Sequence, residues 1–309
     1  MNIFYKLCDE LHPDSVAFAF DLKAPTFRHK MYDEYKAGRK PMPPELAEQM
    51  PVLKDLLRAL GYKIVTKEGY EADDILGTLA FSCKDGNECY IATGDRDSLQ
   101  LVGDNVKVLL ASTKMGRPET NIYDVKRIKD DYGVTPHQLI DIKALMGDSS
   151  DNIPGVSGVG QKTAQSLISE LGSIQNIYDN IDTIDIRETL RNKLKNDKDS
   201  AFMSYKLGEI CKSVPIETDY SFYVPDEGDK GEALSILRSL EMYKLIDKIG
   251  LNTVTYDAKP ENTTVKEYKR VNSLNDFLLK ANKLYFVYSV KDGRFESLAA
   301  CNGDDICEV

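Results

Sequence analysis

The chain has 309 residues, of which 42% are hydrophobic and 29% charged, which is ordinary for a globular protein with room for two domains. No run of 18 apolar residues and no basic-then-apolar N-terminus occurs, which argues against a membrane span or secretion signal and predicts a cytoplasmic protein. The six cysteines form no CxxC pair, so we expect reduced thiols. The net charge of −10 does not exclude a nucleic-acid partner, because the local distribution of charge matters more than its sum.

Apolar patterns in the first part of the chain predict strands and helices in alternation. Short apolar runs predict strands at 15–21, 62–66, 88–93 and 106–110. Helical spacing predicts helices at 44–60, where Gly61 is a stop signal, and from Glu71 to about Cys83. Because strands that alternate with helices build parallel sheets, we expect an α/β domain with a mostly parallel sheet.

From about residue 124 the sequence becomes mainly helical, which predicts a helical subdomain. A glycine-rich stretch interrupts it at 147–164, and a long polar helix is expected near 186–212. Polar, turn-forming residues at 255–264 are typical of a linker, and an apolar strand is expected at 283–290.

Eight acids from four stretches are the main chemical feature of the sequence. They follow expected strands or lie in the glycine-rich stretch: Asp21; Glu71, Asp73 and Asp74; Asp95 and Asp97; Asp148 and Asp151. Ligand crevices of parallel sheets lie at the carboxyl ends of strands, so we expect these acids to converge. Any one stretch alone is better explained by a helix cap or a helix dipole, and only the convergence of four favours function.

Converging carboxylates predict a site for divalent cations. Close carboxylates repel one another unless a cation neutralises them, and hard oxygen ligands suit Mg²⁺ or Mn²⁺. Two such ions can activate a water molecule and stabilise the leaving oxygen of a phosphodiester. The acids therefore predict a two-metal site that cuts nucleic-acid phosphodiesters.

Two further stretches predict contacts with nucleic acid. The segment 23–41 interleaves six cations, including Arg28, Lys36 and Arg39, with aromatic residues such as Tyr35, which suits phosphates and unpaired bases. Taken alone, it is more typical of a solvated charged helix, and its position directly after Asp21 is what favours function.

The stretch 153–168 predicts a glycine hairpin before a helix that begins near Gln161. Exposed amides at such a helix start can hold a phosphate, and Lys162 and Thr163 are placed to add contacts. A plain turn between two helices is the structural alternative. The helix expected around 187–198 adds weaker basic candidates, namely Arg187, Arg191, Lys193 and Lys195.

Taken together and in order, four motifs closely resemble the 5′ nuclease domain of bacterial DNA polymerase I, of the flap endonuclease family: FDLKAPTFRHKMYDEYKAGRKPMP, GYEADDILGTLA, TGDRDSLQL and GDSSDNIPGVSGVGQKTA. The resemblance covers roughly 1–250. It implies a PIN-like α/β nuclease core at 1–135, a helix-hairpin-helix subdomain at 136–250 and a linker at 251–263. At 264–309 it implies a partial second α/β domain, the start of a 3′→5′ exonuclease-like domain.

The resemblance also implies an enzyme, a metal-dependent 5′→3′ exonuclease and flap endonuclease of DNA replication and repair. Its partners would be DNA with 5′ flaps, nicks or RNA primers, and we expect a monomer. Two Mg²⁺ or Mn²⁺ ions are implied, with a K⁺ ion at the helix-hairpin-helix.

By motif match, the residues divide into three groups. Asp21, Glu71, Asp73 and Asp74 would serve the first metal, and Asp95, Asp97, Asp148 and Asp151 would serve the second or bridge the two. Lys36 and Arg39 would be catalytic. The residues expected to bind DNA are Arg28, Tyr35, Lys36, Arg39, Gly158, Gly160, Lys162 and Thr163.

Two departures from the family pattern qualify these expectations. Family members begin with a strand that ends in a further metal-binding Asp, and this chain shows no counterpart, so we expect weak or no nuclease activity. The strand LYFVYSV carries no D-x-E, which predicts a vestigial form of the 3′→5′ exonuclease-like domain. The alternative function is a fragment that binds branched DNA without cutting it. A PIN-like ribonuclease is a third reading, disfavoured because that class is shorter and lacks the GVSGVGQKTA hairpin.

Overall fold

The computed structural model describes residues 1–84, 86–114 and 117–253, and beyond them only the backbone of four strands. It comprises two units, Met1–Val254 and Thr255–Val309, which are described separately. No helix among the described residues is long and apolar enough to cross a membrane.

The strands of the first unit form two groups. β1 (Ala17–Ala19) and β2 (Lys63–Val65) pair in parallel, and so do β3 (Cys89–Thr93) and β4 (Val106–Lys114). These pairs confirm the expected α/β class. A further strand that was not predicted, β5 (Arg117–Tyr123), pairs antiparallel with β4. Its sequence, RPETNIY, has the proline and charges of an edge strand instead of an apolar run.

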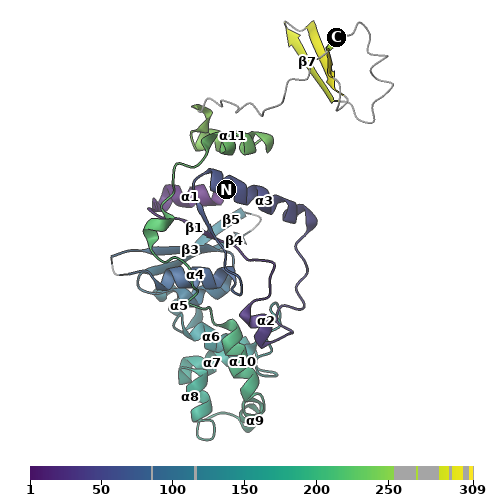
Figure 1. Cartoon of the computed structure of the whole chain (residues 1–309). Coiled ribbons are helices and arrows are strands. Elements are labelled where there is room, and N and C mark those ends of the chain that lie inside the picture. The colour runs from purple at the N-terminus through teal and green to yellow at the C-terminus, as the bar shows by residue number, and fades with distance from the viewer. Residues whose placement is uncertain are drawn as a thin grey trace. The chain divides into compact units, whose positions relative to one another are not determined.

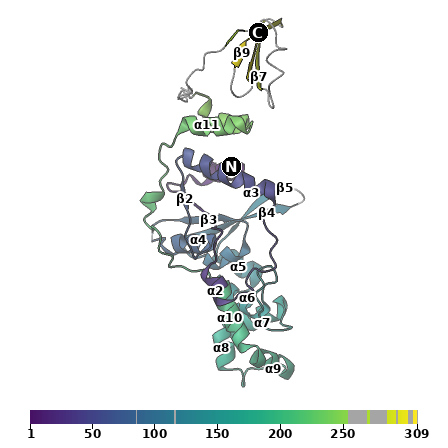
Figure 2. The ribbon, with the colours of Figure 1, turned by 45° about the vertical axis from the view of Figure 1, so that its right-hand side comes forward.

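Helices cover both sides of these strands. Figures 1 and 2 show α1 (Asn2–Leu11) and α3 (Pro44–Ala59) on one side, with α4 (Ala72–Phe81) and α5 (Val125–Tyr132) on the other. α4 packs against both β1 and β3, although no backbone hydrogen bonds join the two groups of strands in the described part of the chain. α4 therefore fixes the acids at its start relative to both groups.

The helical part of this unit lies at one end of it (Figure 1). Its core includes Leu145, Ile168 and Leu194. The helices are α6 (Gln138–Met146), α7 (Gln161–Leu171), α8 (Ile174–Asp179), α9 (Glu188–Asn196) and α10 (Lys198–Gly208). The single long helix expected at 186–212 is wrong, because the chain leaves helical geometry at Asp197, whose side chain accepts a hydrogen bond from the Ser157 amide (2.8 Å).

Short helices complete the first unit. α11 (Lys230–Ser239) packs against α3, and the others are α2 (Phe27–Met31), α12 (Tyr243–Lys248), η1 (Arg96–Leu101), η2 (Tyr220–Tyr223) and η3 (Leu251–Thr253).

In the second unit, four strands form a sheet in the order β6-β9-β8-β7. They are β6 (Lys269–Arg270), β7 (Tyr285–Lys291), β8 (Arg294–Cys301) and β9 (Ile306–Glu308). β7 confirms the strand expected at 283–290. The expected linker lies outside the described residues from position 254 onward, and so does most of 264–309 apart from these strands.

Candidate functional site

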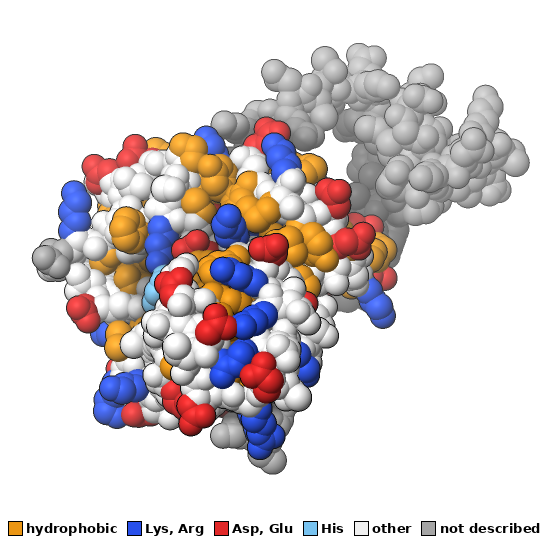
Figure 3. Space-filling view, turned by 90° about the horizontal axis from the view of Figure 1, so that it is seen from below, with side chains coloured by type: hydrophobic (Ala, Val, Ile, Leu, Met, Phe, Trp, Pro, Cys, Tyr) orange, Lys and Arg blue, Asp and Glu red, His pale blue; other side chains and the backbone are white. Residues whose placement is uncertain are grey.

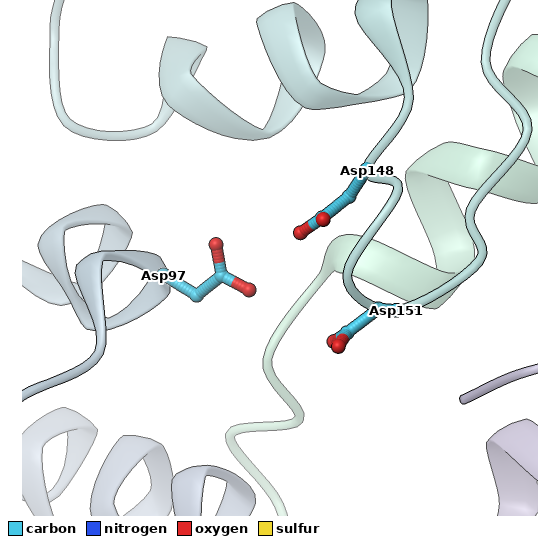
Figure 4. Close-up of side chains that lie close together, drawn as sticks. All are labelled: Asp97, Asp148 and Asp151. Carbon is cyan, nitrogen blue, oxygen red and sulfur yellow. The ribbon is translucent and has the colours of Figure 1, made fainter. Parts of the chain in front are cut away.

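Three carboxylates from separate parts of the chain meet at one place. Asp97 lies in the first turn of η1, directly after β3, and Asp148 and Asp151 lie in the loop between α6 and α7. One carboxylate oxygen from each of the three lies within 4.8 Å of those of the other two, and the side chains point toward a common space (Figure 4). The structure thus brings together three of the eight predicted acids in the geometry of a cation site.

The loop that carries two of these acids is held by its backbone. Gly147 ends α6 with a φ of 72°, and a Cβ there would lie 2.6 Å from the Ile153 carbonyl oxygen, so the position requires glycine. Asp148 and Ile153 exchange two backbone hydrogen bonds of 2.8 Å. This tight turn places Asp148 and Asp151 opposite Asp97.

Asp73, at the start of α4, connects the remaining acids to this group. Burial raises its pKa to about 7, together with the charges of four neighbours, Asp95, Asp97, Asp21 and Glu71. Asp21 accepts a hydrogen bond from the Ala72 amide (2.7 Å), which ties the end of β1 to the start of α4. In the described ranges no Lys or Arg forms an ion pair with Asp21, Asp73 or Asp95, so this half of the cluster carries uncompensated negative charge.

Asp74 does not belong to the cation site, contrary to expectation. It is 0% exposed, and Arg28 holds both of its oxygens at 2.8 Å. The amides of Glu71 (3.0 Å) and Cys211 (2.8 Å) donate to the same two oxygens. With both oxygens occupied on a buried side, Asp74 has none to offer a metal.

Arg28 was expected to bind DNA, and this expectation is also wrong. The residue is 2% exposed, and its guanidinium donates to the carbonyls of Leu207 (2.8 Å) and Glu209 (2.7 Å) as well as to Asp74. Burial lowers the pKa of Arg28, but hydrogen bonding and attraction to Asp74 and Glu71 raise it overall. Arg28 therefore ties α2 to α4 and to the end of α10 and does not reach the surface.

The other predicted residues of the basic segment fold onto the acids. The Tyr35 hydroxyl donates to Glu71 (3.1 Å), and Lys36 Nζ donates to the other oxygen of Glu71 (2.7 Å). Arg39 Nε donates to Asp151 (2.9 Å). The segment is a short helix followed by turns, so the continuous solvated helix is excluded, and its cations stand beside the acidic site as expected.

Lys143, which no sequence motif singled out, contacts two of the clustered acids. Its Nζ donates to Asp97 and to Asp148, the latter at 2.7 Å. Burial lowers the pKa of Lys143, but the attraction of both acids raises it overall, so the side chain stays charged. The only sequence signal was a lysine within the otherwise apolar run IKALM.

The pKa values of the two carboxylates that bond Lys143 are shifted in opposite directions. Although burial opposes it, hydrogen bonds from Lys143 and Ser150 lower the pKa of Asp148 to about 2. The pKa of Asp97 is raised, because burial and the charges of Asp95 and Asp148 outweigh the attraction of Lys143. The negative charge of Asp97 is therefore only partly compensated, although Asp97 and Asp148 share the ammonium of Lys143.

The glycine hairpin presents its predicted residues toward solvent. Gly158 has a φ of 70° and is exposed, Gly160 caps the start of α7, and Lys162 is exposed beside the half-buried Thr163. Lys193 Nζ donates to the Gly158 carbonyl (3.3 Å). In the view from below, Lys and Arg side chains gather in the middle of the face, with acids among them (Figure 3).

Two sequence models of protein families match consecutive parts of the chain. "5'-3' exonuclease, N-terminal resolvase-like domain" matches residues 1–133, and "5'-3' exonuclease, C-terminal SAM fold" matches residues 134–230. The chain belongs to the 5′→3′ exonuclease family. Among curated members, it is 39% identical to DNA polymerase I of Caldicellulosiruptor bescii over 94% of this chain and 34% of that protein. DNA polymerase I of Bacillus subtilis is 39% identical over 88% of this chain and 31% of that protein.

This 5′→3′ exonuclease family chain thus spans about a third of the length of the curated relatives it matches. Among solved structures it resembles T5 5′-exonuclease with bound divalent zinc ions (TM-score 0.57, 23% identity, 77% of this chain and 88% of that chain). It also resembles the catalytic core of Rad2 in complex with a DNA substrate (TM-score 0.51, 21% identity, 80% and 82%). These likenesses confirm the expected fold, an α/β nuclease core with a helical part.

Proposed function

We propose that this chain is the 5′ nuclease module of a DNA polymerase I and hydrolyses phosphodiesters of DNA as a 5′→3′ exonuclease and flap endonuclease. The observation that carries the proposal is the convergence of Asp97, Asp148 and Asp151 from separate elements. Family membership supports it, and so do fold neighbours described with DNA and metal ions. Its substrates would be DNA with 5′ flaps, nicks or RNA primers. The protein would act as a monomer in the cytoplasm.

The donor set fits two divalent cations. Asp97, Asp148 and Asp151 would hold one ion, and Asp21, Asp73 and Asp95 the other. Glu71 would join the second group only by exchanging its hydrogen bond from Lys36 for the ion, because its other oxygen accepts from Tyr35. All donors are carboxylate oxygens, which suit Mg²⁺ or Mn²⁺. The raised pKa of Asp73 reflects an excess of negative charge that a cation would offset. A K⁺ ion at the glycine hairpin is proposed on the family resemblance alone.

The chain's own residues would supply positioning and charge. When bound, the cations polarise the scissile phosphate and lower the pKa of the attacking water. Lys36 lies beside Glu71 at the edge of the acids, where its ammonium would stabilise charge that develops on the phosphate. Arg39, half exposed beside Asp151, would orient the DNA strand that carries this phosphate.

DNA contacts away from the acids would come from the helical part. Gly158 and Gly160 with Lys162 and Thr163 would hold backbone phosphates at the start of α7. We propose a nuclease core at 1–135 and a helix-hairpin-helix subdomain at 136–250. We further propose a linker at 251–263 and the start of a vestigial 3′→5′ exonuclease-like domain at 264–309.

A second candidate is a module that binds branched DNA without cutting it. One observation favours it: in the described residues, Lys36, Arg39 and Lys143 all form ion pairs with acids that would hold metal. A flap-cleavage assay discriminates the two functions. Nuclease function predicts Mg²⁺-dependent release of the flap by wild type, slow in line with the weak activity expected from the sequence, and its loss in Asp97→Asn, with DNA binding in Ca²⁺ retained by both. Tight DNA binding without cleavage by folded wild type would favour the second candidate.

A further inference from the structure

Lys143 places a positive charge inside the acidic cluster. Its side chain is 9% exposed, and its Nζ bonds simultaneously to Asp97 Oδ2 and Asp148 Oδ2. The third carboxylate, Asp151, offers an oxygen within 4.8 Å of those of the other two. The ammonium therefore lies at the oxygens that would hold one of the proposed metal ions.

The fold aims this side chain at the acids. Lys143 belongs to α6, whose end is fixed by the bond from the Gly147 amide to the Lys143 carbonyl (2.8 Å). Its stem runs over Gly208 at the end of α10, where an added Cβ would lie 3.3 Å from Lys143 Cδ. The missing side chain at Gly208 thus leaves the space through which the lysine reaches the site.

An ammonium and a divalent ion compete for these oxygens. The ammonium offers one positive charge and three hydrogen-bond donors, whereas Mg²⁺ draws oxygens to about 2.1 Å and carries two charges. An ion bound by Asp97 and Asp148 would take up the oxygens that now accept from Nζ and would repel it at close range. A lysine can leave, because its charge sits at the end of a flexible four-carbon stem.

We propose that Lys143 is a resident cation of the acidic site, which neutralises Asp97 and Asp148 in the metal-free protein and is displaced when a divalent ion binds. The inference rests on the metal site proposed above and adds a residue that regulates its occupancy. It follows that Lys143 stabilises the metal-free fold and weakens metal binding at this position.

The first test compares two variants that each remove one cation from the same three carboxylates. Lys143→Met removes the buried ammonium, and Arg39→Met removes the half-exposed guanidinium on Asp151. The affinity for Mn²⁺ is measured by calorimetry. The melting temperature of each variant is measured separately, with and without Mn²⁺. We expect Lys143→Met to melt below wild type in EDTA, to recover in Mn²⁺ and to bind Mn²⁺ about tenfold more tightly. Arg39→Met should gain about threefold or less, since the guanidinium is half exposed and bonds a single oxygen of one carboxylate, Asp151 Oδ1.

Equal gains in the two variants would overturn the inference, because net charge alone would then explain them. Weaker binding by Lys143→Met would overturn it too, since Lys143 would then support the metal site. Absence of any Mn²⁺ binding by folded wild type would instead overturn the proposed function, and the two failures are thus distinguishable.

The second test needs no variant and reads displacement directly in wild type. Lysines are acetylated with an activated ester, with and without Mg²⁺, and the modification of each is measured by mass spectrometry. We expect Lys143 to be protected without metal and modified several-fold faster with it, while Lys195, in its exposed pair with Asp182, stays constant. Metal binding with unchanged protection of Lys143 would overturn the inference.

Discussion

The guanidinium of Arg28 and the carboxylate of Asp74 form a bidentate ion pair, with both N–O distances at 2.8 Å and both side chains buried. The pair joins the basic segment to the helix that carries Glu71 and Asp73. It therefore positions the acidic site without belonging to it.

Arg28→Met is expected to destabilise the protein by about 3–5 kcal/mol, because it leaves the buried Asp74 carboxylate without its counter-charge. Urea denaturation in EDTA measures the loss. Arg28→Lys is the matched control and should recover only part of it, since an ammonium cannot bond both oxygens side by side. A loss of less than about 1 kcal/mol, as for exposed pairs, would contradict the structural role.

The stability of the metal-free protein should fall as pH rises from about 4 to about 7. The folded-state pKa of Asp73, about 7, lies above its ordinary value of 3.8, so in this window the folded state binds more protons than the unfolded state. The slope is at most about 1.4 kcal/mol per pH unit for this group. The raised pKa of Asp97 likewise makes stability fall as pH rises. Asp148, with a pKa of about 2, affects the pH dependence of stability only at lower pH.

Urea denaturation at several pH values in EDTA measures this slope. Asp73→Asn should flatten it, and so should Mg²⁺, because each removes the excess negative charge. An unchanged slope in Asp73→Asn would show that other groups cause it.

Lys36→Ala should slow flap cleavage about a hundredfold or more, while binding of the same DNA in Ca²⁺ changes little. The reason is that its ammonium stands at the edge of the acids, on Glu71, and would act on charge that develops during the reaction. Single-turnover cleavage with saturating enzyme measures the rate of the chemical step separately from DNA binding. If the loss were entirely in affinity, Lys36 would be a binding residue only.

Lys162→Ala should weaken DNA binding to a similar extent for every sequence and reduce the salt dependence of binding by about one phosphate contact. Lys162 is exposed at the start of α7, beside the amides that would hold a phosphate. Lys244→Ala, an exposed lysine on α12, is the control and should change neither quantity. Titrations at several salt concentrations provide the measurement, and equal effects of both variants would count against a hairpin contact.

Sequence patterns predicted the strands and helices near the acids because apolar runs bounded by acids and glycines are local signals. They could not separate Asp73 from Asp74, since adjacent residues of a helix point about 100° apart and the facing surface is set by tertiary packing. Asp73 turns to the acids and Asp74 to Arg28.

The two other errors have similar causes. Arg28 looked like a surface cation because its buried partners lie 43 or more residues away in the sequence. The break between α9 and α10 falls at Asp197, with no glycine or proline to mark it, and depends on the contact with Ser157.

The number of divalent ions bound per chain tests the central claim most directly. Calorimetric titration of the wild-type chain with Mn²⁺ should give two sites, because the acids form two groups around Asp73 and around Asp97 with Asp148. Asp97→Asn, with its fold verified, should retain one site and lose the other. A wild-type chain that binds no ion, or an Asp97→Asn variant that still binds two with unchanged affinity, would contradict the account.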